Sequence, residues 1–591
     1  MFRAYDIGET ESERKKMLDE LLENIFQHCI TAEGMDELTN DQFLTIITRK
    51  MEPFIHDLML FLSTDVKDKA QAIAFRAKGN EYFHPTSKEG LGKALIYYNL
   101  SIAYAEKGSE ERAIAYTNRS MVCLQYERYE ECLVNIRLAR ESNCPERLME
   151  KLNRREAAAL DGLLKPHTDT GIEREDVDEL KLSYNSHKNV PQMVECLELH
   201  RNEEFGRHMV TTRKLKAGDI LMIEKPFATM LNDDAKLTRC AHCHDIKPLI
   251  LIPCEGCTMA MYCSEECLSK AHGQYHRYEC AMLKDLWRIC GNKDMGGMAG
   301  IRTVATAIAL FDHDLDEMKD HLNGLDESKV NAFMMDWRTA TPKDMYDTVH
   351  VLSTNQALRS RKEQAMQIFF ATIIHQLMLE RTELGEICAT NAENRKLLFD
   401  LILRHWQISQ VNSIVIEEVQ LVEDKLEAYR YKYACLSLIS MLNHSCVPNV
   451  THIPLYDGRC AVMAVRPIAA GEQLFDCYSF IANDLCKSDR LIHLKKHYQF
   501  TCRCGGCALE VEDGDYELDE YMKFMRCIRN LDSISDAISS VISHLNAAER
   551  RFLSYKLIEP QLRLPIYVGL QQSAITIALT ESKTKSHHHK P

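Results

Sequence analysis

The sequence predicts a multidomain α+β protein. We expect a helical N-terminal region, a β-rich domain split by a cysteine-rich segment and a helical insertion, a second cysteine motif, and a helical C-terminus. At 591 residues the chain is too long for a single hydrophobic core. A strand–turn–strand pattern, RKLKAGDILMIE from Arg213, returns as RPIAAGEQLFDCY from Arg466. Cysteines and long helical stretches lie between the two copies, so one β-rich domain with a large insertion is expected.

Composition narrows the class of protein. An apolar content of 45% and a charged content of 27% are those of an ordinary soluble chain. The formal net charge of −15 argues against binding nucleic acid by general electrostatics, and we expect no direct sequence-specific nucleic-acid binding. The N-terminus is too polar for a signal peptide, and no run of apolar residues is long enough to span a membrane. We therefore expect a monomer located in the cytoplasm and nucleus.

Residues 1–165 are predicted to be helical. Between residues 70 and 165, small side chains such as Gly79, Ala94 and Ser120 alternate with large ones at helical spacing, as in stacked helix pairs. This stretch resembles tetratricopeptide (TPR) repeats, although an irregular helical bundle remains an alternative. Three repeats would suit a groove that binds a protein partner. The acidic stretch that follows, within 166–190, is predicted to be a linker.

The segment 240–280 carries eight soft metal ligands in 41 residues. Eight such ligands fill two tetrahedral Zn²⁺ sites, and a segment this short needs the metal to fold. Scattered reduced cysteines are the less probable interpretation. His272 is a nearby competitor for His276, but the x3 spacing to the last cysteine favours His276. The spacing is that of Cys240-x2-Cys243, Cys254-x2-Cys257, Cys263-x3-Cys267 and His276-x3-Cys280.

A third cysteine group, Cys502-x-Cys504-x2-Cys507, is one ligand short of a tetrahedral zinc site. Elsewhere, the apolar run LSLISML stops at the polar stretch Asn443-His444-Ser445-Cys446. Burying these polar groups costs several kcal/mol unless each finds a partner. They therefore form either a surface turn or the wall of a site.

Together these motifs resemble the SET- and MYND-domain (SMYD) family of protein-lysine methyltransferases. The N-terminal repeats resemble those of its tetratricopeptide-bearing, fourth-member type. The resemblance covers roughly residues 70–510 and implies a SET fold that threads the NHSC strand beneath a loop. The domain boundaries that we expect are as follows: 1–165 helical TPR-like region; 166–190 linker; 191–239 SET N-terminal part; 240–280 MYND zinc finger; 281–405 helical SET insertion; 406–480 SET C-terminal core; 481–510 post-SET zinc motif; and 511–591 C-terminal helical region.

The family resemblance also implies how the metal ligands pair. It places Cys446 as the fourth ligand of the post-SET zinc, so three Zn²⁺ ions are expected. In the finger it implies interleaved pairing, with no open coordination position and hence no catalytic role. The implied sets are Cys240, Cys243, Cys263 and Cys267; Cys254, Cys257, His276 and Cys280; and Cys446, Cys502, Cys504 and Cys507.

The same resemblance implies an S-adenosylmethionine site. Tyr478 matches the catalytic tyrosine, and Tyr498 and Phe500 match aromatic residues that close the cofactor and lysine channel. The Phe205–His208 turn carries one glycine where many SET domains carry two, which puts the fit of the cofactor at this turn in question. The implied cofactor-binding residues are Phe205, Gly206, Arg207, Asn412, Asn443, His444, Tyr478, Tyr498 and Phe500.

The chemistry is consistent with that role. Methyl transfer from a sulfonium to an amine is an in-line displacement that needs positioning and a neutral lysine. An aromatic channel beside a positive sulfonium lowers the lysine pKa. We expect a protein substrate, histone or non-histone, with the repeats and the finger recruiting protein partners. The alternative is a weakly active or inactive scaffold that acts as a corepressor-type adaptor.

Overall fold

The computed structural model describes residues 9–31, 37–62, 65–165, 180–290, 295–422, 425–455, 458–479, 486–508 and 542–543. The chain divides into two compact units, each assembled from three separate segments. The first unit comprises Met1–Glu175, Met230–Lys319 and Ser360–Leu403, and the second comprises Asp176–Thr229, Asp320–Arg359 and Arg404–Pro591.

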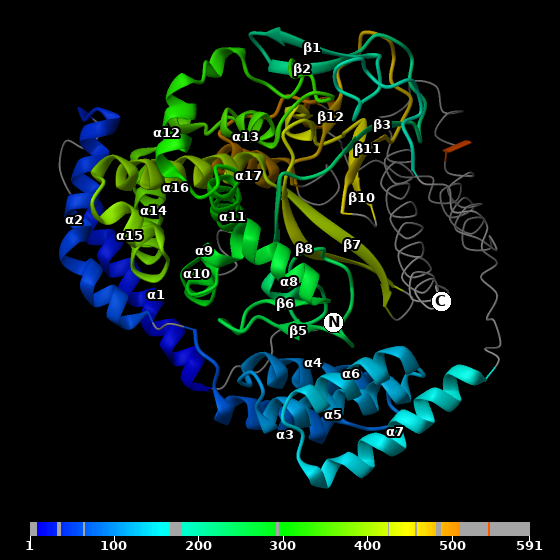
Figure 1. Ribbon diagram of the computed structural model, residues 1–591. Coiled ribbons are helices and arrows are strands. Elements are labelled where there is room, and N and C mark those ends of the chain that lie inside the picture. The colour runs from blue at the N-terminus through cyan, green and yellow to red at the C-terminus, as the bar shows by residue number, and fades with distance from the viewer. Residues whose placement is uncertain are drawn as a thin grey trace. The chain divides into compact units, whose positions relative to one another are not determined.

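The first unit begins with two groups of helices (Figure 1). The first pair packs with a later helix, α14, and α2 starts at a capping box in which Thr39 and Gln42 bond each other's backbone N–H. The next five helices stack in order, each on its neighbour. The bounds are α1 (Glu9–Ile30), α2 (Asn40–Phe61), α3 (Lys69–Tyr82), α4 (Lys88–Tyr104), α5 (Glu110–Gln125), α6 (Tyr129–Glu141) and α7 (Glu146–Leu164).

The cysteine-rich finger and most of the helical insertion complete this unit. The finger contains a short β-hairpin, β5–β6, followed by a helix that continues through a π-helical turn at His272–His276. Its strand β5 lies against α4. The bounds are β5 (Ile252–Pro253), β6 (Met261–Tyr262), α8 (Glu265–Ala271), α9 (Arg277–Glu279), α10 (Leu283–Cys290), α11 (Met295–Leu310), α14 (Arg361–Arg381) and α15 (Leu384–Ala389), with α12 (Leu315–Gly324) and α16 (Ala392–Asn412) crossing into the second unit.

The second unit holds the described strands other than β5 and β6, with β4 running across the boundary into the first unit. Three pairings matter for the site: the hairpin β1–β2, the antiparallel sheet β10–β11–β3, and the two-residue parallel pair β12–β9. The hairpin β7–β8 is the longest of its antiparallel pairs. The bounds are β1 (Leu197–Asn202), β2 (Gly206–Thr211), β3 (Ile220–Glu224), β4 (Ala228–Leu231), β7 (Ile414–Val422), β8 (Lys425–Cys435), β9 (Asn443–His444), β10 (Val450–Pro454), β11 (Cys460–Ala464), β12 (Phe475–Asp476), α13 (Pro342–His350), α17 (Lys487–Tyr498) and α18 (Gly505–Ala508).

The two similar strand–turn–strand segments lie side by side. Leu215 and Ile468 occupy equivalent positions in the two copies, and each donates its N–H to the other's carbonyl at 2.9 and 3.1 Å. In both turns an acidic side chain accepts a backbone N–H three residues earlier: Asp219 from Lys216, and Glu472 from Ala469. The insertion between the copies therefore leaves the two halves of one β-rich domain hydrogen-bonded to each other.

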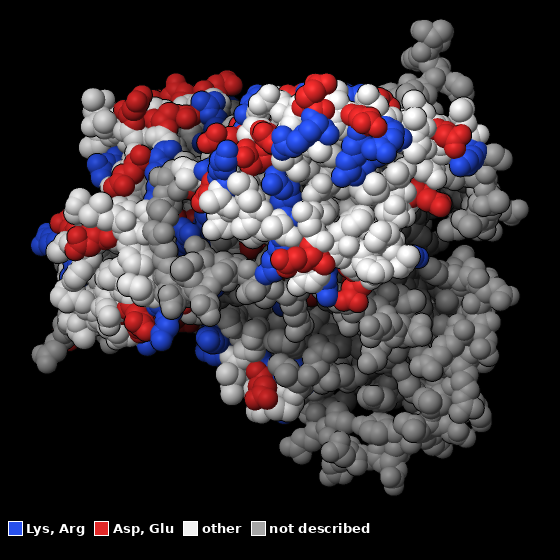
Figure 2. All heavy atoms as spheres, turned by 90° about the horizontal axis from the view of Figure 1, so that it is seen from below, with Lys and Arg blue, Asp and Glu red and all other residues white. Residues whose placement is uncertain are grey.

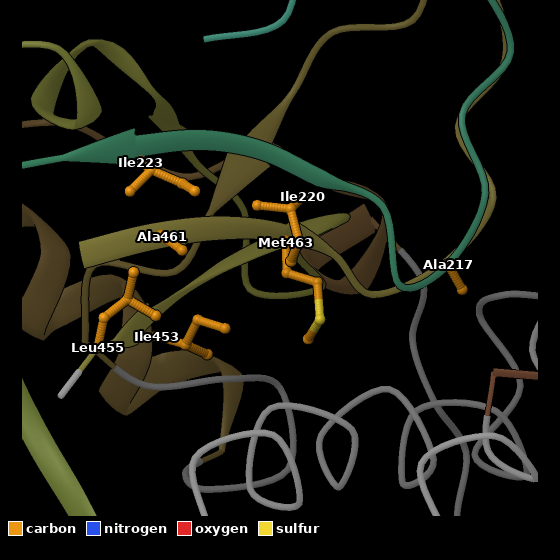
Figure 3. Close-up of a cluster of buried hydrophobic side chains, with 7 residues drawn as sticks. All are labelled: Ala217, Ile220, Ile223, Ile453, Leu455, Ala461 and Met463. Carbon is orange, nitrogen blue, oxygen red and sulfur yellow. The ribbon is translucent and has the colours of Figure 1, made fainter. Parts of the chain in front are cut away.

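Apolar side chains from both halves fill the core beneath this sheet. Figure 3 shows the cluster, to which β3 contributes from the first half and β10 and β11 contribute from the second. Each member is at most 9% exposed, so this burial stabilises the pairing of the halves. The cluster consists of Ala217, Ile220, Ile223, Ile453, Leu455, Ala461 and Met463.

The structure agrees with the predicted multidomain α+β class, with one local difference in the second half. The composition of the SET C-terminal core, predicted over 406–480, indicates a strand from residue 408, but α16 continues to Asn412, and β7 begins two residues later. The predicted C-terminal helices and most of the linker lie outside the described residues. No helix in the described part combines the length and hydropathy needed to cross a bilayer. The face in Figure 2 carries interspersed acidic and basic side chains.

Candidate methyl-transfer site and metal centres

The polar stretch after LSLISML is held by a parallel strand. Asn443 and His444 form β9, which pairs with Phe475 and Asp476 of β12. The backbone N–H of Ser445 extends this pairing by donating to the Asp476 carbonyl at 2.9 Å. These polar residues therefore pair with a second strand and do not form a surface turn, which excludes one of the two alternatives that the sequence left open.

Asn443 connects this strand to the glycine turn of β1–β2. Its side-chain amide donates to the carbonyls of Phe205 and Arg207, both at 3.1 Å. Gly206 between them has a φ of +60°, a left-handed conformation that favours glycine, and a Cβ there would have no neighbour within 4 Å. The structure thus brings the single-glycine turn directly against the NHSC strand. The positive φ at this position, and not a lack of space for a side chain, explains why a glycine is found here.

Tyr478 lies where these segments meet. Its hydroxyl donates to the Leu442 carbonyl at 2.7 Å, and its backbone N–H donates to His444 Nδ1 at 3.0 Å. Its ring centre is 5.0 Å from that of Tyr498 and 6.2 Å from that of Phe500. Burial, together with the nearby Asp476 charge, raises the pKa of Tyr478. The phenol therefore stays protonated at neutral pH and can orient a group, but it cannot serve as a general base.

His444 links this aromatic cluster to a metal centre. Burial lowers the pKa of His444 to about 4, so its imidazole is neutral. Because Nδ1 accepts the Tyr478 N–H, the ring proton is assigned to Nε2, which lies 3.4 Å from Cys446 Sγ. An N–H donated to a ligating sulfur is the usual outer contact of a zinc site. One side chain therefore contacts both the tyrosine and the metal ligand.

The third cluster contains the predicted four thiols. Cys446 Sγ lies 3.6 Å from Cys507 Sγ and 3.9 Å from Cys502 Sγ, and Cys504 completes the group. Tetrahedral Zn²⁺ with bonds of about 2.3 Å separates its sulfurs by roughly 3.8 Å, so the spacing fits zinc. Arg490 of α17 lies 3.8 Å from Cys507 Sγ and was not predicted from the sequence.

The first finger cluster matches its predicted ligand set. Cys240, Cys243, Cys263 and Cys267 come together, with Cys263 Sγ 3.6 Å from both Cys243 and Cys267. The backbone N–H of His242 points at Cys240 Sγ at 3.4 Å. These distances also fit a tetrahedral zinc site.

The second finger cluster gathers five donors instead of four. Cys254, His276 and Cys280 are joined by His272, whose Nε2 is 3.8 Å from Cys254 Sγ. Cys257 Sγ also lies 3.5 Å from His276 Nε2. The π-helical turn at His272–His276 places the extra histidine here. The sequence named His272 only as a competitor of His276, whereas the structure brings both histidines to the cluster.

Of the two remaining predicted site residues, Tyr498 bonds Tyr478 and Asn412 does not. The Tyr498 hydroxyl donates to the Tyr478 carbonyl at 2.9 Å, and burial raises the pKa of Tyr498 to about 12. The Asn412 amide donates instead to the carbonyls of Ser353 and Ile408, both at 2.8 Å. Asn355, in a left-handed conformation, donates to the Tyr498 carbonyl at 3.1 Å.

Two buried acids near the site had no sequence motif. Glu224 on β3 accepts the backbone N–H groups of Leu438 and Ile439 at 3.0 and 2.9 Å, just before the NHSC strand. Asp476 accepts His452 Nδ1 at 2.8 Å. An acid ending an apolar strand, as in DILMIE, is the one local signal that could have singled out Glu224.

Comparison with known proteins agrees with this geometry. The model of the SET domain matches residues 206–479. The SMYD4 protein-lysine N-methyltransferase of Danio rerio is 22% identical over 80% of this chain and 70% of its own length, and that of Homo sapiens is 23% identical over 75% and 68%. A SET and MYND domain-containing protein of Dictyostelium discoideum is 25% identical over 53% of this chain and 81% of its own.

A solved SET domain, that of LSMT bound to lysine and AdoHcy, shows only a weak structural likeness. It is 10% identical, its TM-score is 0.21, and the match covers 65% of this chain and 87% of that one; at this score it adds no weight to the assignment.

The split β-rich domain, the NHSC strand and the cysteine clusters define a SET-domain protein with a zinc-finger insertion. The chain contains a SET domain, and SMYD4 protein-lysine N-methyltransferases are similar to it over most of its length. The resemblance to the SMYD family that the sequence indicated is thereby confirmed.

Proposed function

We propose that the chain is an S-adenosylmethionine-dependent protein-lysine N-methyltransferase. The observation that supports it best is Tyr478, whose hydroxyl lies at the junction of the NHSC strand and the aromatic residues Tyr498 and Phe500. The names of the SMYD4 relatives agree with this activity. Bound S-adenosylmethionine would supply an electrophilic methyl group on a sulfonium.

The residues of the chain would position and desolvate the lysine. The Tyr478 hydroxyl already donates its proton to Leu442, so its oxygen is oriented to accept an N–H from the incoming amine. This contact would point the nitrogen lone pair at the methyl group. Tyr498 and Phe500 would exclude water and lower the lysine pKa, because burial disfavours the charged amine. No group of the chain has to act as a strong base.

The cofactor would be held at the Asn443 strand and the Phe205–Arg207 turn. Both amide hydrogens of Asn443 point at carbonyls of this turn, so its contact with the cofactor would use Oδ1 or the backbone. Asn412 would act from farther away: its carbonyl accepts the Ser440 hydroxyl at 3.0 Å, three residues before Asn443.

Direct measurements test the proposal. Zinc-loaded protein is titrated calorimetrically with S-adenosylmethionine, and transfer of a labelled methyl group is followed on a peptide array. Tyr478→Phe should lower the rate by roughly 100-fold or more, as expected for loss of one positioned hydrogen-bonding group, while cofactor affinity changes little. Tyr126→Phe is the control, since that hydroxyl is exposed and bonds only the Lys88 carbonyl among its recorded partners.

Absence of cofactor binding by zinc-loaded protein would overturn the proposal. Binding without transfer to any array peptide or lysate protein would instead favour the scaffold function. We further propose that the finger engages protein partners, that the chain acts as a monomer, and that it works in the cytoplasm and nucleus. The array would also identify the substrate sequence and the degree of methylation.

A further inference from the structure

Three buried polar residues on successive repeat helices face the zinc finger. Asn99 of α4, Arg119 of α5 and Asn135 of α6 are each 0% exposed. They bond one another: Arg119 donates to Asn99 Oδ1 at 2.8 Å and to Asn135 Oδ1 at 2.6 Å. A fully buried polar row in a helical stack is costly unless every group is satisfied.

The finger backbone supplies an acceptor for each of the three residues, although Arg119 Nη2 has no hydrogen-bond partner among the described residues. Asn99 donates to the Pro248 carbonyl at 2.8 Å, Asn135 to the Leu249 carbonyl at 2.7 Å, and Arg119 to the Leu251 carbonyl at 2.8 Å. Asn99 also donates to the Leu237 carbonyl at 2.9 Å. These three side chains therefore bind main-chain carbonyl oxygens, which are present in every peptide whatever its sequence. The Leu249 side chain packs on an apolar cluster of α4 and α5 that includes Leu91, Tyr98 and Val122.

Arg119 makes this contact necessary for the repeats themselves. All three of its recorded acceptors are neutral oxygens, one of which belongs to the finger. Burial lowers the pKa of Arg119 to about 10, so the guanidinium is still charged at neutral pH. A buried charge without enough acceptors is strongly destabilising. The Leu251 carbonyl thus stabilises the repeat helices as much as Arg119 stabilises the finger.

Charged contacts flank the clamped segment on its C-terminal side. Arg112 of α5 forms a two-pronged ion pair with Glu255, at 2.7 and 2.9 Å. Lys67 donates to the carbonyls of Cys254 and Cys257 at 2.5 and 2.6 Å. The segment 248–251 also lies between the first and second cysteine pairs of the finger. It begins as a turn in which the Ile250 N–H donates to the Lys247 carbonyl at 3.1 Å. Zinc bound by the flanking cysteine pairs would fix both ends of this turn while the helices hold its carbonyls.

We propose that the face of α4–α6 is a peptide-backbone clamp that the chain fills with its own finger segment, Pro248–Leu251. The repeats then serve as a zinc-dependent holder of the finger. The sequence had led us to expect a face open to a protein partner. In this proposal the face is already occupied and cannot recruit one. This inference is independent of the proposed methyl transfer.

Arg119→Met tests the clamp in the full-length, zinc-loaded chain. It replaces a buried cation by an apolar side chain of similar length, which helix packing tolerates. We expect amide hydrogen exchange in the segment 248–253 to become at least tenfold faster while α4–α6 stay protected. Arg140→Met is the matched control, because that arginine lies on α6 and pairs only with Glu156 and Asn153 among its recorded contacts. Unchanged exchange at 248–253 in Arg119→Met would overturn the proposal.

A second measurement does not depend on the folding of that variant. A labelled peptide with the sequence of Lys247–Pro253 is added to wild-type protein before and after zinc chelation. The filled clamp should give no binding before chelation, and release of the finger should give saturable binding afterwards. Arg119→Met should bind the peptide at least tenfold more weakly after chelation. Equal binding with and without zinc would show that the face is open, and this too would overturn the proposal.

Discussion

Glu224 shows how one side chain can fix the approach to the site. Its carboxylate accepts two backbone N–H groups at the start of the short helical turn that leads into Asn443. Burial raises the pKa of Glu224 to about 7, against the smaller opposing effect of those hydrogen bonds. Ionising this acid in the core therefore costs more than its hydrogen bonds to the turn return.

This arrangement predicts a pH-dependent stability. Unfolded Glu titrates near 4.3, so the contribution of Glu224 to stability is complete below about pH 4 and is lost as pH rises through about 7. Relative to Glu224→Gln, the wild-type free energy of unfolding should fall by roughly 3 kcal/mol across that range. Chemical denaturation at several pH values measures it. Ser437→Ala, a neutral change beside the same carboxylate, should run parallel to wild type; a parallel Glu224→Gln curve would contradict the prediction.

The surplus histidine of the second finger cluster leads to another prediction at this scale. Since His272, His276, Cys254 and Cys280 already form a four-donor group, Cys257→Ala should keep three zinc ions per chain. Cys243→Ala is the matched change in the first cluster, where no fifth donor was found among the described residues, and it should lose one ion. Metal analysis counts the ions, and cobalt substitution reports the ligand set. Loss of an ion in both variants would show that His272 does not ligate.

At the scale of elements, the sequence predicted the features that depend on periodicity and on the spacing of metal ligands. The N-terminal helices, the finger ligands and the convergence of Cys446 with the CxCxxC motif all follow from local patterns or from family resemblance. The position where α16 ends could not be predicted in this way, because QVNSIVI has the composition of a strand while its first residues continue a helix. The clamp could not be foreseen either, since its contacts join residues more than 100 positions apart.

We expect the strand β9 and the post-SET cysteine cluster to depend on the same zinc ion and to lose their order together. Cys446→Ser removes one of four thiols, and with it the ion that holds Tyr498 and Phe500 beside Cys502. We expect two zinc ions per chain instead of three, and faster exchange over residues 498–507. Cys460→Ser is the control, a buried cysteine on β11 outside the three clusters. Three ions in Cys446→Ser would disprove the shared site.

At the scale of the whole chain, the reactivity of the cysteine thiols reports the folded state. The cysteines among the described residues are free thiols, and of these only Cys486 is exposed. Among the described cysteines of zinc-loaded protein, Cys486 should therefore react first with a thiol reagent, and the eleven cysteines of the predicted metal sites should follow only after chelation. Peptide mass spectrometry assigns each modified residue. Early modification of the finger cysteines in the presence of zinc would contradict the three-site assignment.

The clamp also has a consequence for how the chain is made. Asn99, Arg119 and Asn135 precede their finger carbonyls by 114 to 149 residues. At synthesis rates of about 5–20 residues per second, helices α4–α6 leave the ribosome roughly 6 to 30 seconds before the finger does. Throughout that interval the Arg119 cation and the amides of Asn99 and Asn135 lack the finger carbonyls as acceptors, because the finger has not yet been translated. During this period, any exposed peptide backbone nearby can compete for the place that Pro248–Leu251 will occupy.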